Sequence, residues 1–164
     1  MQERCKIGVV IGNANSPHAV NIMKGIDQAS KECDVQIMYF MNVSSPYTAQ
    51  LYPTDTSIGW DYQKSAIYDY ARYVKADVLI MTYGMMSIFM KSDYGKQYLE
   101  YFRNVPCVLI NEQTDRPNWT SIIVDNYNGM YELVEHLVRD HGYHNFAFLA
   151  GPSGNTDACQ RKRA

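Results

Sequence analysis

The sequence predicts an α/β protein whose parallel sheet is doubly wound and sandwiched between helices, a three-layer α/β/α arrangement. Two observations lead to this fold class. Short runs rich in Val and Ile recur along the 164 residues, and amphipathic helical segments separate them. This alternation is typical of right-handed βαβ units, in which helices cover both faces of a parallel sheet. The length corresponds to one ordinary domain, and a hydrophobic content of 46% is enough to bury a core.

Six segments have the apolar character of strands, and the first of them has the composition of a strand that is buried on both faces. We expect these strands at residues 6–11, 35–41, 77–82, 107–110, 121–124 and 145–150. Each run is short and borders a polar or glycine-containing turn, as buried parallel strands usually do.

Helical periodicity fills most of the intervals between the strands. The first helix has the clearest start, because Ser16 is suited to cap it and Pro17 to occupy its first position. Its apolar face runs over 19–33. Other helices are expected at 66–74, 94–102, 130–138 and from 156 onward. The interval 44–60 is long, polar and aromatic, which indicates either a surface excursion or an interaction loop.

Charge and composition exclude several classes of protein. The net charge of -2 argues against a basic nucleic-acid-binding module. No apolar run approaches the roughly 18 residues that a membrane span needs, and the start of the chain lacks the features of a signal peptide. The four cysteines are far apart and form no CxxC pair, so we expect free thiols and a cytoplasmic protein.

The motifs of common α/β enzymes are missing from this sequence. The turn after the first strand has no GxGxxG, no Gly-Lys-Ser/Thr string is present, and 151–155 does not match the GxSxG nucleophile elbow. His136, His141 and His144 gather near one helix end without the HExxH spacing of a metal-binding helix. A helix C-terminus that favours cations explains them more simply. We therefore predict a protein that is not an enzyme, with no cofactor and no metal.

In a doubly wound sheet, ligands bind outside the carboxyl ends of the strands. This rule directs attention to the segments that follow each predicted strand, which are 13–18, 42–45, 83–84, 111–112, 125–126 and 151–155. His18 lies in the first of them and could be either an ordinary residue at a helix start or a ligand contact.

The last third of the chain carries a recognisable pattern. Asp125-Asn126 followed by Gly129, then Glu135-His136-Leu137, then 141–152 resembles the effector-binding core of the lac-repressor (LacI) family. That family shares its fold with periplasmic sugar-binding proteins. The opening strand and its proline-containing turn fit the same pattern. The resemblance implies a type I periplasmic-binding-protein-like fold, with an N-terminal lobe at 1–125 and the beginning of a C-terminal lobe at 126–164.

The resemblance also implies a function, which is the binding of a small polar effector such as a sugar or nucleoside between two lobes. First-lobe contacts would come from Ser16, Pro17, His18, Tyr83, Gly84 and Asn111, and Arg161 matches a second-lobe arginine. Asn111 stands where the family usually has an aspartate. A homodimer is expected, with no membrane association and no DNA-binding element in this chain. The output would be transcriptional, or a signalling module such as a diguanylate cyclase or kinase.

Two alternatives remain open at this point. The chain could be an interaction or dimerisation module without a ligand, using Tyr47, Tyr52 and Trp60 of the long aromatic interval. It could also be a fragment of an exported solute-binding protein. The resemblance leaves the C-terminal lobe incomplete, so the apolar faces of 130–138 and 146–149 would lack partners and favour self-association.

Overall fold

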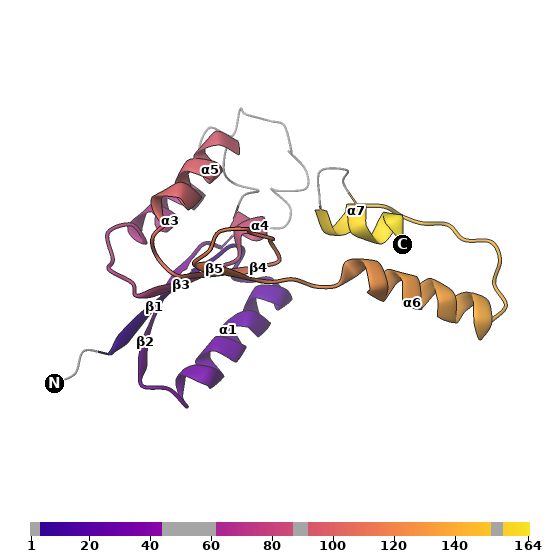
Figure 1. Ribbon diagram of the computed structural model, residues 1–164, viewed down its shortest axis with the longest axis horizontal. Coiled ribbons are helices and arrows are strands. Elements are labelled where there is room, and N and C mark those ends of the chain that lie inside the picture. The colour runs from indigo at the N-terminus through magenta and orange to yellow at the C-terminus, as the bar shows by residue number, and fades with distance from the viewer. Residues whose placement is uncertain (1–3, 44–61, 87–91, 152–155) are drawn as a thin grey trace. The chain divides into compact units, whose positions relative to one another are not determined.

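The computed structural model describes residues 4–43, 62–86, 92–151 and 156–164. The chain divides into two compact units, Met1–Ile123 and Val124–Ala164. The first unit contains a parallel sheet with the strand order β2-β1-β3-β4-β5 (Figure 1). The chain adds β2 on one side of β1 and the later strands on the other side, so the predicted doubly wound sheet is confirmed.

Five of the six predicted strands are present. They are β1 (Cys5–Ile11), β2 (Val35–Met41), β3 (Val78–Met81), β4 (Cys107–Ile110) and β5 (Trp119–Ile122). Strand β1 is central, with Val9 opposite Tyr39 of β2 on one side and Ile80 of β3 on the other. Strand β5 ends two residues earlier than expected, because its last ladder partner is Ile110, where β4 also ends.

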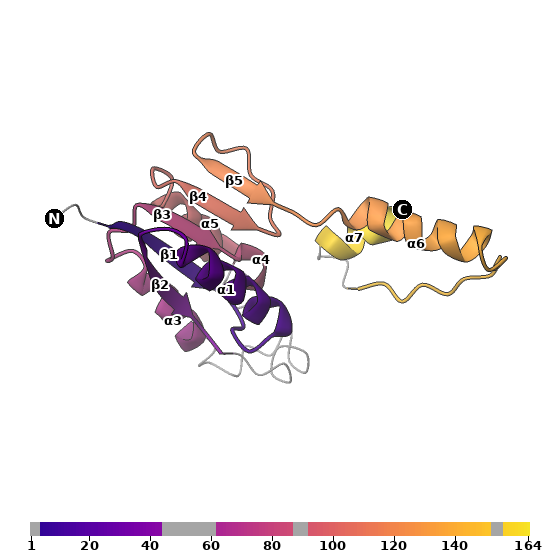
Figure 2. The same cartoon turned by 90° about the horizontal axis from the view of Figure 1, so that it is seen from below.

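Helices cover both faces of the sheet, as Figures 1 and 2 show. On one face lies α1 (Pro17–Ser30), and on the other lie α3 (Tyr62–Tyr70) and α5 (Ser92–Tyr101). The alternation of side chains along β1 matches this arrangement. Val9 and Ile11 pack with Ala19 of α1, whereas Val10 belongs to the opposite cluster. The three-layer prediction is therefore confirmed. A short helix, α4 (Tyr83–Met86), follows β3 and was not expected.

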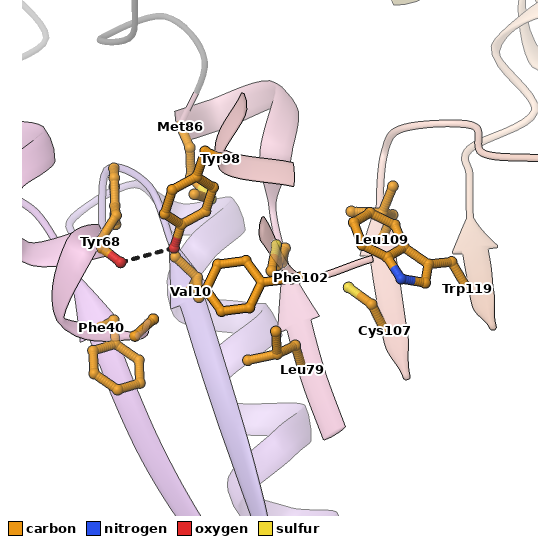
Figure 3. Packing of buried hydrophobic residues seen from close by; sticks show 12 residues of the cluster. Val10, Phe40, Tyr68, Leu79, Met86, Tyr98, Phe102, Cys107, Leu109 and Trp119 are labelled. Carbon is orange, nitrogen blue, oxygen red and sulfur yellow. Dashed lines mark hydrogen bonds between the residues drawn. The ribbon is translucent and has the colours of Figure 1, made fainter. Parts of the chain in front are cut away.

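The larger of the two core clusters lies between the sheet and α3 and α5 (Figure 3). Its centre is aromatic. The fully buried hydroxyl of Tyr98 donates a hydrogen bond to the carbonyl oxygen of Tyr68, over 2.8 Å. The ring of Tyr98 also meets Phe102 edge to face, with centroids 5.1 Å apart. The hydrogen bond joins α3 to α5, and both rings belong to the cluster that packs these helices against the sheet.

The second unit holds α6 (Asn126–Arg139) and α7 (Thr156–Arg163). Asp125 caps α6, since its carboxylate accepts a hydrogen bond from the backbone N–H of Asn128 at 3.1 Å. Beyond the other end of α6, Gly142 adopts a φ of +68°, the left-handed conformation that commonly follows a helix end. No helix among the described residues is long and apolar enough to cross a membrane.

The predicted strand at 145–150 is wrong, because this segment has no regular structure. A parallel strand is stabilised by hydrogen bonds to a neighbouring strand. The second unit contains no other strand among its described residues, so the apolar run has nothing to pair with. Phe146 and Phe148 are each 49% exposed, and Leu149 is 96% exposed.

Candidate functional site

The turn after β1 is built on two buried polar side chains from neighbouring strands. The side chain of Asn42, at the end of β2, accepts the backbone N–H of Asn13 at 2.8 Å. The hydroxyl of Thr82, at the end of β3, accepts the backbone N–H of Gly12 at 3.0 Å. These bonds hold Asn13 in a left-handed conformation with φ +49°. The three strand ends are thereby joined at one edge of the sheet.

This turn leads directly into the start of α1. Ser16 caps the helix, because its hydroxyl accepts the backbone N–H of Ala19 at 3.1 Å. Pro17 occupies the first helical position, as predicted, and the exposed His18 follows it. The hydroxyl of Ser16 is therefore engaged in the cap, while the imidazole of His18 extends from the first turn of the helix.

His18 meets a residue that is 93 positions away in sequence. Its Nε2 lies 2.9 Å from Nδ2 of Asn111, which follows β4 directly. Asn111 has a left-handed backbone with φ +60°, and its N–H donates to the carbonyl of Ile122 at 2.8 Å. Asparagine tolerates this conformation better than most residues. The ends of β1 and β4 thus present an imidazole and a carboxamide to each other.

Gly84 borders the same place. A Cβ added to it would lie 3.8 Å from the carbonyl oxygen of Asn111, so the start of α4 approaches the end of β4 closely. The side chain of Tyr83 takes a different direction. It packs against the core cluster of α3 and α5, and its hydroxyl lies beside Gly95 of α5. Burial, and then the charge of Glu112, raise the pKa of Tyr83.

The structure therefore brings together five of the seven residues named from sequence, which are Ser16, Pro17, His18, Gly84 and Asn111. It directs the Tyr83 ring into the core. Arg161 lies on α7 in the second unit, where its guanidinium is 4.0 Å from the carboxylate of Asp157. Tyr47, Tyr52 and Trp60 are outside the described residues.

Two residues that position the site were not named from sequence. The sequence predicted 42–45 as a segment that follows a strand and could border a ligand site, but nothing local marks Asn42 as the support of Asn13. Thr82 was placed inside a strand. Their roles depend on strands that are neighbours in space only, although a polar residue at the end of a buried strand is the signal that could have found both.

The edge of the sheet carries polar side chains where His18 and Asn111 meet. An imidazole, a carboxamide and exposed backbone can hydrogen-bond an uncharged polar ligand, since each can donate or accept. Among the described residues, no group of three or more His, Cys, Asp or Glu side chains is arranged to hold a metal ion. This arrangement is suited to binding a polar molecule at the strand ends.

Comparison with known proteins gives similarity in fold. No family model matches the chain, and no curated protein sequence matches it. A solved structure of the lac repressor dimer bound to operator and an anti-inducer is 19% identical, with a TM-score of 0.69. The structural match covers 99% of this chain and 49% of the repressor chain.

Two further solved structures extend the comparison. One is GanP, a glucose-galactose binding protein from Geobacillus stearothermophilus, which is 17% identical with a TM-score of 0.65. The match covers 99% of this chain and 52% of the GanP chain. The other is the transcription regulator CcpA of Lactococcus lactis, which is 15% identical with a TM-score of 0.62. The match covers 98% of this chain and 51% of the CcpA chain. The chain thus has the fold of LacI-type repressors and type I periplasmic binding proteins, and it spans about half the length of these chains.

Proposed function

We propose that this protein is a cytoplasmic ligand sensor of the LacI type, whose first unit supplies one half of the binding site for a small polar effector. The single observation that carries the proposal is the contact between His18 and Asn111. It brings two hydrogen-bonding side chains to the strand ends, where proteins with doubly wound sheets bind their ligands. The fold similarity to LacI-type repressors and to a glucose-galactose binding protein supports the same assignment.

The chemistry of the pair favours a ligand with hydroxyl groups, such as a sugar or nucleoside. A hydroxyl both accepts and donates. It can therefore accept from Nδ2 of Asn111 and donate to Nε2 of His18, replacing the direct contact between them. A neutral asparagine at this position supplies both a donor and an acceptor.

The other first-lobe contacts in this proposal are backbone groups near Ser16, Pro17 and Tyr83-Gly84, because the Ser16 hydroxyl caps α1 and the Tyr83 ring is in the core. Arg161 would serve from the second lobe, where its guanidinium can donate several hydrogen bonds in one plane. Effector binding would then shift an open-closed equilibrium of the two lobes. A transcriptional or signalling output would follow that equilibrium.

A homodimer is the second part of the proposal. The lac repressor to which this chain is similar was solved as a dimer. Analytical ultracentrifugation over a hundredfold range of protein concentration would test this expectation. A sedimentation coefficient that stays at the monomer value throughout would contradict it.

The effector proposal is tested by calorimetry and thermal unfolding of the full-length protein with monosaccharides, disaccharides and nucleosides. We expect one of these classes to release or absorb heat on mixing and to raise the Tm. His18→Ala and Asn111→Ala should each weaken that response by roughly tenfold, because each removes about 1–1.5 kcal/mol of hydrogen bonding. Asn21→Ala is the matched control, since Asn21 is an exposed residue of the same helix.

Either of two results would overturn the effector proposal. One is the absence of any response across the whole panel. The other is an effector whose affinity is unchanged in both the His18 and the Asn111 variants. The absence of any response would favour the alternative drawn from the sequence, an interaction module that binds no ligand.

A further inference from the structure

The C-terminal end of α6 brings two histidines together. His136 is in the last turn of the helix, and His141 follows the capping residue Asp140. Two backbone hydrogen bonds fold the chain back at this point, from the N–H of Gly142 to the carbonyl of Val138 and from Tyr143 to Leu137, both 3.1 Å. The left-handed Gly142 permits the reversal. The two imidazoles face each other as a result.

The distance between their ring nitrogens matches that of a pair of metal ligands. Nε2 of His136 lies 3.2 Å from Nε2 of His141. Two nitrogens that each bind zinc at about 2.0–2.1 Å with near-tetrahedral geometry are separated by about 3.3 Å. The rings are nearly perpendicular, at 86°, with centroids 4.8 Å apart. One ion between the two nitrogens would therefore need little rearrangement of either side chain.

Neighbouring groups contact both rings, and the carboxylate beside His136 orients it as metal-binding histidines usually are oriented. The carboxylate of Asp140 lies 2.6 Å from Nδ1 of His136 and fixes the proton on that nitrogen. This leaves the lone pair of Nε2 facing outward, as in the carboxylate–histidine–metal arrangement. Tyr143 stacks on His141 with an interplanar angle of 12°. The negative end of the helix dipole adds a further attraction for a cation.

We propose that His136 and His141 form a binding site for one divalent transition-metal ion of the zinc, nickel and copper class, with Asp140 as the positioning residue. Imidazole nitrogen prefers these ions to calcium or magnesium. The site has two protein ligands, and its exposure to solvent leaves the remaining positions to water. Metal binding needs the lone pairs of both Nε2 atoms, so a proton on Nε2 of His141 moves to Nδ1 of the same ring or leaves to water.

This inference is independent of the proposed effector function, because His136, Asp140 and His141 are not among the residues proposed to bind the effector. The test is calorimetric titration of the whole chain with Ni²⁺ in buffer without chelators, and electron paramagnetic resonance of the Cu²⁺-loaded chain. We expect the calorimetric titration to show one Ni²⁺ ion bound per chain through this pair. The resonance spectrum of bound Cu²⁺ should show coupling to two nitrogen atoms. His136→Gln and His141→Gln should each weaken Ni²⁺ binding by tenfold or more, and Asp140→Asn by about tenfold.

His144→Gln is the matched control, because His144 is an exposed histidine just beyond the same turn. We expect this variant to bind Ni²⁺ like the unaltered chain. Circular dichroism would confirm that each variant keeps its helical content. The proposal is overturned if the unaltered chain binds no Ni²⁺ at millimolar concentration, or if the double variant of His136 and His141 binds it undiminished. An equal loss in the His144 variant would also overturn it.

Discussion

The hydroxyl of Tyr98 donates its hydrogen bond to the carbonyl of Tyr68 from inside the core, 30 residues away in sequence. Burial raises the pKa of Tyr98, which therefore stays protonated as a donor at any ordinary pH. The same carbonyl also accepts the N–H of Ala71 at 3.1 Å, so removing the tyrosine hydroxyl leaves it with a partner. The bond joins the two helices that cover one face of the sheet.

Tyr98→Phe should lower the free energy of unfolding by about 1 kcal/mol, the usual net value of one hydrogen bond. Urea denaturation would measure the change. Tyr101→Phe is the matched control, because that hydroxyl donates to the carbonyl of Arg72 from an exposed position. We expect a smaller loss there. Equal losses in the two variants would contradict the interpretation.

Two glycines should respond in opposite directions to replacement by alanine. A Cβ on Gly12 would lie 2.7 Å from the backbone carbon of Met85, and backbone cannot move aside as a side chain can. Gly12→Ala should therefore destabilise the fold by about 1–3 kcal/mol. Gly25, inside α1, has nothing within 4 Å of an added Cβ. Gly25→Ala should stabilise by about 0.5–1 kcal/mol. Urea denaturation would measure the free energy of unfolding of both variants. A change of the same sign in the two variants would refute this prediction.

The cysteines should differ sharply in reactivity. Cys107 is 3% exposed, and burial raises its pKa to about 12, an effect that the nearby charge of Arg116 only partly offsets. Its thiolate is then about one part in 10⁴ at pH 8, and the thiolate is the reactive form. Cys5 and Cys33 are exposed. Alkylation followed by mass spectrometry should label these two in the folded protein and Cys107 only after unfolding.

Acidic pH should destabilise the N-terminal turn of α6, which Asp125 caps. The backbone N–H and the side chain of Asn128 both donate to Asp125 and lower the pKa of its carboxyl. The resulting stabilisation is fully present above the unfolded pKa of about 3.9, and it is lost as the pH falls through the lower pKa of the folded state. The Asn128 amide signal in NMR spectra should report this loss. Asp125→Asn still caps the helix without a titrating group, so its Asn128 signal should not change over that pH range.

Local patterns were sufficient for much of the first unit. The apolar runs located β1, β2 and β4, because strands packed under helices bury mostly apolar side chains. Ser16 and Pro17 predicted the start of α1, since capping depends on residues within one turn. The order of strands and helices then implied a doubly wound sheet, and with it the edge where His18 and Asn111 meet.

Long-range contacts determined the rest. Strand β5 stops at Ile122 because its neighbour β4 stops at Ile110, and the run 145–150 has no strand beside it to complete a ladder. The side chain of Tyr83 lies in the core because Gly95 leaves room for it. Likewise, Asn42 supports Asn13 only because β2 and β1 are adjacent. Hydrophobic periodicity records which face of an element is buried, but a hydrogen bond between distant residues exists only once the chain has folded.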